Sequence, residues 1–120
     1  MSDVASVRAA LLELHRLLVE AQRLEAERFG GRMSASEALQ AAADDLRFAW
    51  LKEISELIVA LDQARADDEP ETARALIGKV RELLVPPDSD SAFGARYLRA
   101  LQDHPDVVFA HRDLTAALEA

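Results

Sequence analysis

"FAWLKEISELIVALD", residues 48–62, is the stretch of sequence that decides the fold. Apolar side chains recur along it every three or four positions, which is the period of an amphipathic helix. They form two neighbouring stripes, Leu51, Ile54, Ile58 and Leu61 in one and Trp50, Leu57 and Ala64 in the other. Because the apolar arc is wide and the charged arc narrow, we expect this helix to be the most buried one. It is predicted to start near Asp44 and to end near Ala66.

The same stretch contains the only tryptophan of the chain, Trp50, close to Phe48. Aromatic walls and a titratable group are typical of ligand pockets. Phe48, Trp50, Tyr97 and His111 are therefore the candidate interaction or pocket residues. The simpler interpretation is that residues 48–62 form the central helix of the core. It stays open whether Phe48 and Trp50 are covered by this chain or by a second copy.

The N-terminal part of the chain predicts a long helix over residues 3–28. Its main apolar seam alternates steps of three and four residues and consists of Val4, Val7, Leu11, Leu14, Leu18 and Ala21. Four further apolar residues widen the seam, namely Leu12, Leu17, Val19 and Leu24. A seam this wide indicates packing on more than one neighbour. Gly30 and Gly31 are expected to end the helix, because glycine accepts the positive φ of a C-cap.

A short second helix is predicted to follow this long one. The sequence "SASE", residues 34–37, has the pattern of a capping box, in which Ser34 and Glu37 bond each other's backbone N–H groups. The apolar face of this helix is small, with Leu39, Ala42, Ala43 and Leu46. Asp is a poor interior residue but a good N-cap, so we place a break between the second and third helices near Asp44.

Three more helices are predicted beyond the opening stretch, each preceded by proline. Pro70 suits the first turn of a helix over residues 71–85, and Pro86 and Pro87 stop it. The next helix presents Phe93, Tyr97, Leu98 and Leu101. The last helix starts near Pro105 and presents Val107, His111, Leu114 and Leu118. The sequence therefore predicts an all-α fold, a single-domain bundle of five or six helices with short loops over residues 1–120.

Composition excludes several classes of function. The net charge is −8, and the arginines are spread among acids, so we expect no nucleic-acid partner and no membrane partner. The chain has no cysteine, which excludes disulfides and thiolate metal sites. The first residues lack the pattern of a signal peptide, and a cytoplasmic location is expected. Abundant Ala and Arg suggest a GC-rich bacterial genome.

Metal-binding motifs are missing from the sequence. The Glu-x-x-His pair of di-iron bundles is absent at every histidine. A site could assemble only from scattered residues such as His15, Glu53, Glu56 and His111. "DSDSAFGARYLR", residues 88–99, begins like a calcium loop but lacks its glycine and its closing glutamate. We expect no metal and no cofactor.

Catalytic motifs are missing as well. No Gly-x-Ser-x-Gly elbow surrounds Ser55, and the acid pairs fall at predicted helix ends, where capping explains them. No catalytic residue is predicted, and an enzyme is the less favoured interpretation. Arg96 and Arg99, one turn apart with Tyr97 between them, could receive an anion or an acidic partner. A solvated helix face is the simpler explanation of this pair.

Three functions are compatible with these patterns. The favoured one is a non-enzymatic interaction module that binds itself, as a homodimer, or a protein partner through the surplus apolar faces of the first and third helices. The alternative is a small-molecule-binding protein or enzyme with an aromatic-lined pocket between helices. A third is a regulator whose acidic surface occupies a basic site. Helical bundles host all three roles.

Overall fold

The computed structural model describes residues 3–30, 34–37 and 48–119 of the chain. These residues form five α-helices and one short 3-10 helix and include no strand, which confirms the all-α fold. In chain order the elements are α1 (Val4–Gly30), η1 (Ala49–Leu51), α3 (Lys52–Ala66), α4 (Pro70–Leu84), α5 (Ala92–Asp103) and α6 (Pro105–Glu119). Residues 35–37 add one helical turn. None of the described helices has an apolar stretch of the length needed to cross a membrane.

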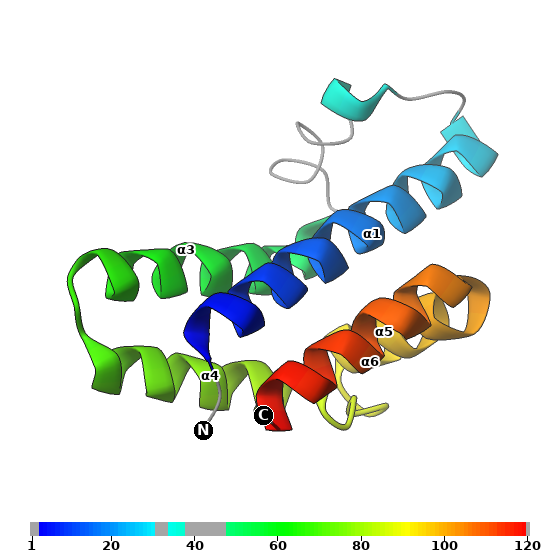
Figure 1. Cartoon of the computed structure of the whole chain (residues 1–120). Helices are drawn as coiled ribbons and strands as arrows, with labels where there is room; N and C mark the ends of the chain where they lie inside the picture. Colours follow the sequence, from blue (N-terminus) through cyan, green and yellow to red (C-terminus); the bar gives the residue numbers. More distant parts are fainter. Residues whose placement is uncertain (1–2, 31–33, 38–47, 120) are drawn as a thin grey trace.

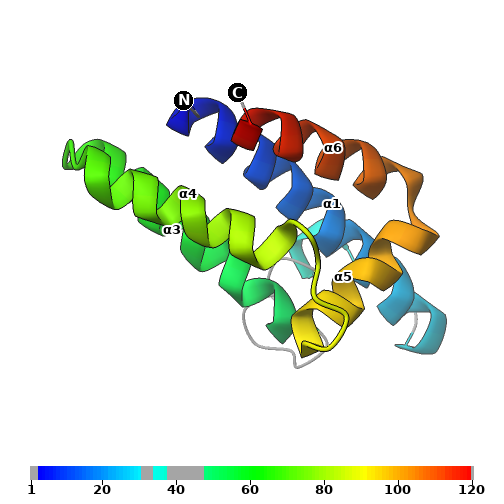
Figure 2. The ribbon, with the colours of Figure 1, turned by 90° about the horizontal axis from the view of Figure 1, so that it is seen from below.

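The long helix α1 lies between two pairs of shorter helices. Figures 1 and 2 show the α3–α4 hairpin on one side of α1 and the pair α5 and α6 on the other. The contact between α1 and α6 is the most extensive one between described helices, followed by that between α3 and α4. The beginning of α1 and the end of α6 consequently lie side by side (Figure 2). The first helix thus packs against α6 on one side and against α3 and α4 on the other.

The predicted seam of α1 is confirmed as the centre of the core. Val7, Leu11, Leu14 and Leu18 are completely buried, and Val19 is nearly so. Completely buried side chains from the other elements meet this seam, among them Phe48, Leu51, Ile54, Leu61, Val80, Leu84, Tyr97, Val107 and Leu114. The width of the apolar seam predicted that α1 packs on more than one helix. In the structure it packs on α6 from one side and on α3 and α4 from the other.

The stretch predicted to be the most buried helix carries more buried side chains than the helices that follow it. Six are buried over residues 48–66, namely Phe48, Leu51, Ile54, Ile58, Leu61 and Ala64, against four on α4 and four on α6. The longer helix α1 contributes more than any of them. Within the stretch, α3 packs on α1 and α4, and its remaining surface faces solvent. Val59 on that surface is 67% exposed.

The start of this helix also differs from the expectation. Residues 49–51 form a 3-10 helix, and the α-helix begins only at Lys52. A 3-10 turn winds more tightly than an α-helix and is frequent at helix N-termini. In this turn Phe48 and Leu51 are both buried, while Trp50 stays partly exposed. The predicted break near Asp44 lies outside the described residues, as do Gly31 and the apolar face formed by Leu39, Ala42, Ala43 and Leu46.

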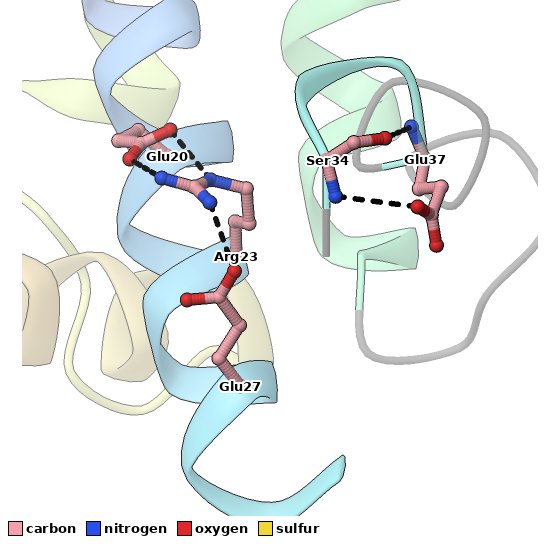
Figure 3. Close-up of polar contacts among 5 residues, drawn as sticks. All are labelled: Glu20, Arg23, Glu27, Ser34 and Glu37. Atoms are coloured by element: carbon pink, nitrogen blue, oxygen red, sulfur yellow. Dashed lines mark hydrogen bonds and ion pairs between the residues drawn. The ribbon is translucent and has the colours of Figure 1, made fainter. Parts of the chain in front are cut away.

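Local hydrogen bonds fix several of the helix ends predicted from the sequence. The capping box is present: the Glu37 N–H donates to Ser34 Oγ at 3.1 Å, and the Ser34 N–H donates to Glu37 Oε1 at 3.4 Å (Figure 3). Ser91 caps α5 by accepting from the Gly94 N–H at 2.8 Å. Pro70 occupies the first turn of α4, and Pro105 that of α6. These interactions set the helix lengths that bring the candidate residues together.

Surface ion pairs support the C-terminal half of α1. Arg23 donates to Glu20, one turn before it, and to Glu27 Oε1 at 2.9 Å, one turn after it (Figure 3). Pairs at this spacing stabilise a helix by about 0.2–0.5 kcal/mol each. They therefore stabilise the outer face of this segment, whose inner face holds the buried Ala21, Gln22 and Ala26.

Candidate functional site

Aromatic rings from three elements form a row through one end of the molecule. The ring of Trp50 on η1 lies 5.5 Å from that of Phe93 on α5, centroid to centroid. Phe93 is in turn 5.9 Å from Tyr97, and Tyr97 is 5.5 Å from the imidazole of His111 on α6. Tilted rings at these separations attract each other beyond simple burial. Three of the four candidate residues, Trp50, Tyr97 and His111, therefore belong to one connected row.

Two of the four candidate residues are enclosed within the core. Phe48 and Tyr97 are completely buried, so neither forms the wall of an open pocket. Phe48 is covered by this chain itself, which answers the question that its position raised. Trp50 and His111 are partly exposed and lie at the two ends of the row. Of the four rings in the row, Tyr97 is completely buried, while Trp50, Phe93 and His111 are partly exposed.

Tyr97 and His111 share a short hydrogen bond. The Tyr97 hydroxyl and His111 Nδ1 are 2.6 Å apart. When the neutral imidazole carries its proton on Nε2, Nδ1 accepts from the hydroxyl. Burial raises the pKa of Tyr97 well above its ordinary value and lowers the pKa of His111. At neutral pH both groups are therefore uncharged, and the pair stabilises the contact between α5 and α6.

This pair leads to a prediction about the pH dependence of stability. Burial lowers the pKa of His111 and also that of His15, so each binds a proton more readily in the unfolded chain. Their stabilising effect is complete above the unfolded pKa of about 6.5 and is lost as the pH falls below it. We expect the free energy of unfolding, measured by urea titration, to be lower at about pH 5.5 than at about pH 7.5.

The variant His111→Gln tests the origin of this effect. It removes one of the two titrating imidazoles and should reduce the difference in unfolding free energy between the two pH values. The carboxyl groups of Glu13, Glu20 and Asp62 have pKa values lowered by arginine contacts, and they act below this pH window. An unchanged pH difference in His111→Gln would show that the imidazole does not control it.

A cavity of about 370 Å³ opens beside Trp50, between α1, η1 and α5. Small side chains of α1 and α5 form part of its wall, among them Ala21 and Ala100. Its polar lining includes Gln22, Arg96, Arg99, Asp103 and His104. The Trp50 Nε1–H donates to Gln22 Oε1 at 3.0 Å and holds the indole at the edge of the cavity. This cavity is the place where a candidate aromatic residue meets charged side chains.

The cavity corrects one sequence-based hypothesis and adds a residue that the sequence analysis missed. Tyr97 is buried in the core, so it does not share a surface with the exposed Arg96 and Arg99. The aromatic residue that lines the same cavity as these arginines is Trp50. Gln22 was overlooked, although it lies one helical turn after the seam residue Leu18. Its position in line with the apolar seam could have indicated a buried polar side chain.

A second concave surface runs along the outer side of α1. This groove of about 620 Å³ is lined by apolar and small side chains of α1, among them Ala9, Leu12 and Val19. Arg8, Glu13, Arg16 and Glu20 stand around it. Leu12 is 41% exposed there, because it lies on the part of the wide seam that no described helix covers completely.

Within residues 3–30, 34–37 and 48–119, no three His, Asp or Glu side chains come together as a possible metal site. The scattered set considered from the sequence, His15, Glu53, Glu56 and His111, is not assembled by the fold. Comparisons with protein-family models, with curated proteins and with solved structures found no match to this chain.

Proposed function

We propose that the protein is a non-enzymatic interaction module that forms a homodimer through α1 and α3. The observation that carries the proposal is an apolar surface that these two helices leave uncovered. Leu12 on α1 is 41% exposed and Val59 on α3 is 67% exposed. Exposed apolar groups that lie together are typical of protein interfaces. We call this surface the Leu12 face and define it by Ala9 and Leu12 on α1 together with Val59 on α3.

Geometry places Leu12 and Val59 on the same side of the helix pair. Arg8 on α1 donates two hydrogen bonds to the Asp62 carboxylate on α3, at 2.8 and 3.1 Å. The two helices run in opposite directions (Figure 1). Leu12 is one turn after Arg8, and Val59 is one turn before Asp62, so the two apolar side chains follow the ion pair on the same side. One partner docking on this side can therefore cover both side chains.

Charge favours a second copy of the chain as that partner. The chain carries a net charge of −8, so two copies repel each other over most orientations. Around the groove of the Leu12 face, Arg8 and Arg16 balance Glu13 and Glu20. A two-fold axis would bring the arginines of one copy toward the glutamates of the other, which is the self-complementary pattern of a symmetric dimer. This face is thus one where two copies approach without net repulsion.

Light scattering coupled to size exclusion tests the proposal directly. The monomer has a mass of 13.2 kDa, and we expect twice this mass at protein concentrations of tens of micromolar. The mass should decrease toward that of the monomer on dilution. A protein that stays monomeric at these concentrations would refute the homodimer.

Substitutions at matched exposed positions locate the interface. Leu12→Gln and Val59→Gln are each expected to weaken dimerisation by about tenfold or more, because a buried apolar side chain contributes roughly 1.5–3 kcal/mol. Val108 on α6 is 44% exposed and does not line the groove of the Leu12 face, so Val108→Gln is the control. Dissociation constants from sedimentation equilibrium provide the comparison. Equal weakening by the control variant would place the interface elsewhere.

A further inference from the structure

Gln22 is an unusual residue for its position on α1. Its side chain belongs to the buried part of the helix, where the residue is only 5% exposed, and its neighbours along the seam are apolar. Leaving a buried polar group without a hydrogen-bond partner costs about 1–3 kcal/mol. The Gln22 amide is therefore expected to form hydrogen bonds. One of these bonds is known: Gln22 Oε1 accepts from the Trp50 indole at 3.0 Å.

That bond determines where the other half of the amide points. The indole N–H can only donate, so the atom that faces it must be the amide oxygen. The Gln22 NH₂ group is thereby turned away from Trp50. No hydrogen bond of this NH₂ group is found among the described residues, and it is not completely sealed from solvent. Gln22 lines the cavity beside Trp50, and no described residue accepts a hydrogen bond from its two amide N–H donors.

The guanidinium groups of α5 face the same cavity. Arg96 and Arg99 are one turn apart and both line it. Arg99 makes one loose ion pair with Asp103, at 3.8 Å, and Arg96 makes none within the described part of the chain. Glu25 and Asp103 also line the cavity, so acids are present, but Asp103 is engaged by Arg99. Gln22 Nε2 and Arg96 are therefore donors without a partner among the described residues, and Glu25 is the lining acid without one.

We propose that this cavity binds a small organic anion, with its carboxylate or phosphate held by Gln22 Nε2 and Arg96 and a flat apolar body against Trp50. A volume of about 370 Å³ is at the lower end of the range for small-molecule sites and accommodates a single ring with one anionic group. The partly buried ring of Phe93 packs against the indole, with 5.5 Å between the ring centroids. Trp50 is thus held in place by Gln22 and Phe93 before any molecule binds, and preorganisation of this kind favours binding.

Fluorescence of Trp50, the only tryptophan, reports on this site without labelling. Titrations with benzoate and phenyl phosphate are expected to give saturable changes at millimolar concentrations or below. Benzyl alcohol and benzylamine have the same ring without the anionic group and should bind at least tenfold more weakly. Inorganic phosphate alone should bind weakly, because it lacks the ring. Equal affinity for benzyl alcohol would overturn the proposal, as would the absence of any response to both anions.

Two variants separate the roles of the donors. Arg96→Gln is expected to weaken benzoate binding by about tenfold or more, because charge-assisted hydrogen bonds are the strong ones. Arg74 on α4 is equally exposed and does not line the cavity, so Arg74→Gln is the matched control and should leave binding unchanged. Gln22→Glu keeps the acceptor for the Trp50 indole but replaces the NH₂ group by a carboxylate oxygen, and it should abolish binding of the anions.

Failure of Gln22→Glu to fold would leave Arg96→Gln as the decisive variant, since Arg96 is exposed and unpaired among the described residues. Equal affinities of Arg96→Gln and Arg74→Gln for benzoate would refute the proposal. The cavity lining shares no residue with the groove of the Leu12 face, so the titration can be repeated in Leu12→Gln. If Leu12→Gln still binds benzoate, anion binding does not depend on dimerisation.

Discussion

Replacing Gly94 with alanine is expected to lower the free energy of unfolding by about 2–4 kcal/mol. A Cβ at this position would lie 1.8 Å from the carbonyl oxygen of Asp88 and 2.8 Å from Ser91 Oγ. The loop before α5 folds back onto the first turn of the helix, and Ser91 both donates to Asp88 O and caps the helix at the Gly94 N–H. The obstructing atom at 1.8 Å is backbone, so no side-chain rotation relieves the clash.

Gly78→Ala provides the matched control for this substitution. Gly78 lies in the interior of α4, and a Cβ there would meet no atom within 4 Å. Alanine is favoured over glycine inside a helix by about 0.8–1 kcal/mol, so this variant should be more stable than the wild type. Urea denaturation followed by circular dichroism gives both values. A Gly94→Ala protein as stable as the wild type would show that the loop does not press on α5 as described.

Truncation of Leu114 to alanine is expected to cost about 2–5 kcal/mol. Leu114 is completely buried on α6, the helix that makes the most extensive contact with α1. Removing most of its side chain leaves a cavity that neighbouring core residues fill only in part. The loss should appear in thermal and in chemical denaturation, with the denaturant m-value close to that of the wild type.

Phe109→Ala on the same helix removes a larger side chain and should nevertheless cost less than about 1 kcal/mol. Phe109 is 55% exposed, and the guanidinium of Arg112 lies 5.1 Å from its ring centroid. An exposed cation–π contact is worth roughly 0.5–1 kcal/mol, which sets the size of the expected loss. If Phe109→Ala destabilised the protein as strongly as Leu114→Ala, burial would not be the property that controls stability here.

The architecture was predictable because its signals are periodic or local. The steps of three and four residues along α1 correctly identified Val7, Leu11, Leu14 and Leu18 as core. Capping by Ser34 and Ser91, and the first-turn prolines of α4 and α6, involve residues within three or four positions of each other. Interactions of this range depend on the chemistry of adjacent side chains, and that chemistry can be read directly from the order of residues.

The candidate site was predicted less well because its contacts join distant parts of the chain. Trp50 was selected for its type alone, while its hydrogen-bond partner Gln22 lies on another helix. The patch of Tyr97 with Arg96 and Arg99, which was the less favoured hypothesis, does not form, since helical rotation directs Tyr97 into the core and the arginines to solvent. The tertiary arrangement decides which aromatic ring meets which charge, and periodicity along one helix does not contain that information.

The packing of α6 on α1 has a kinetic consequence. Residues 31–104 separate these two helices, so their contact closes the largest loop in the described fold. Closing a loop of this length costs conformational entropy on the order of 4 kcal/mol before the contact repays it. The hairpin of α3 and α4 closes over only a few residues and is expected to form early in folding. Docking of α6 then completes the core, so folding requires both ends of the chain and proceeds from its middle outward.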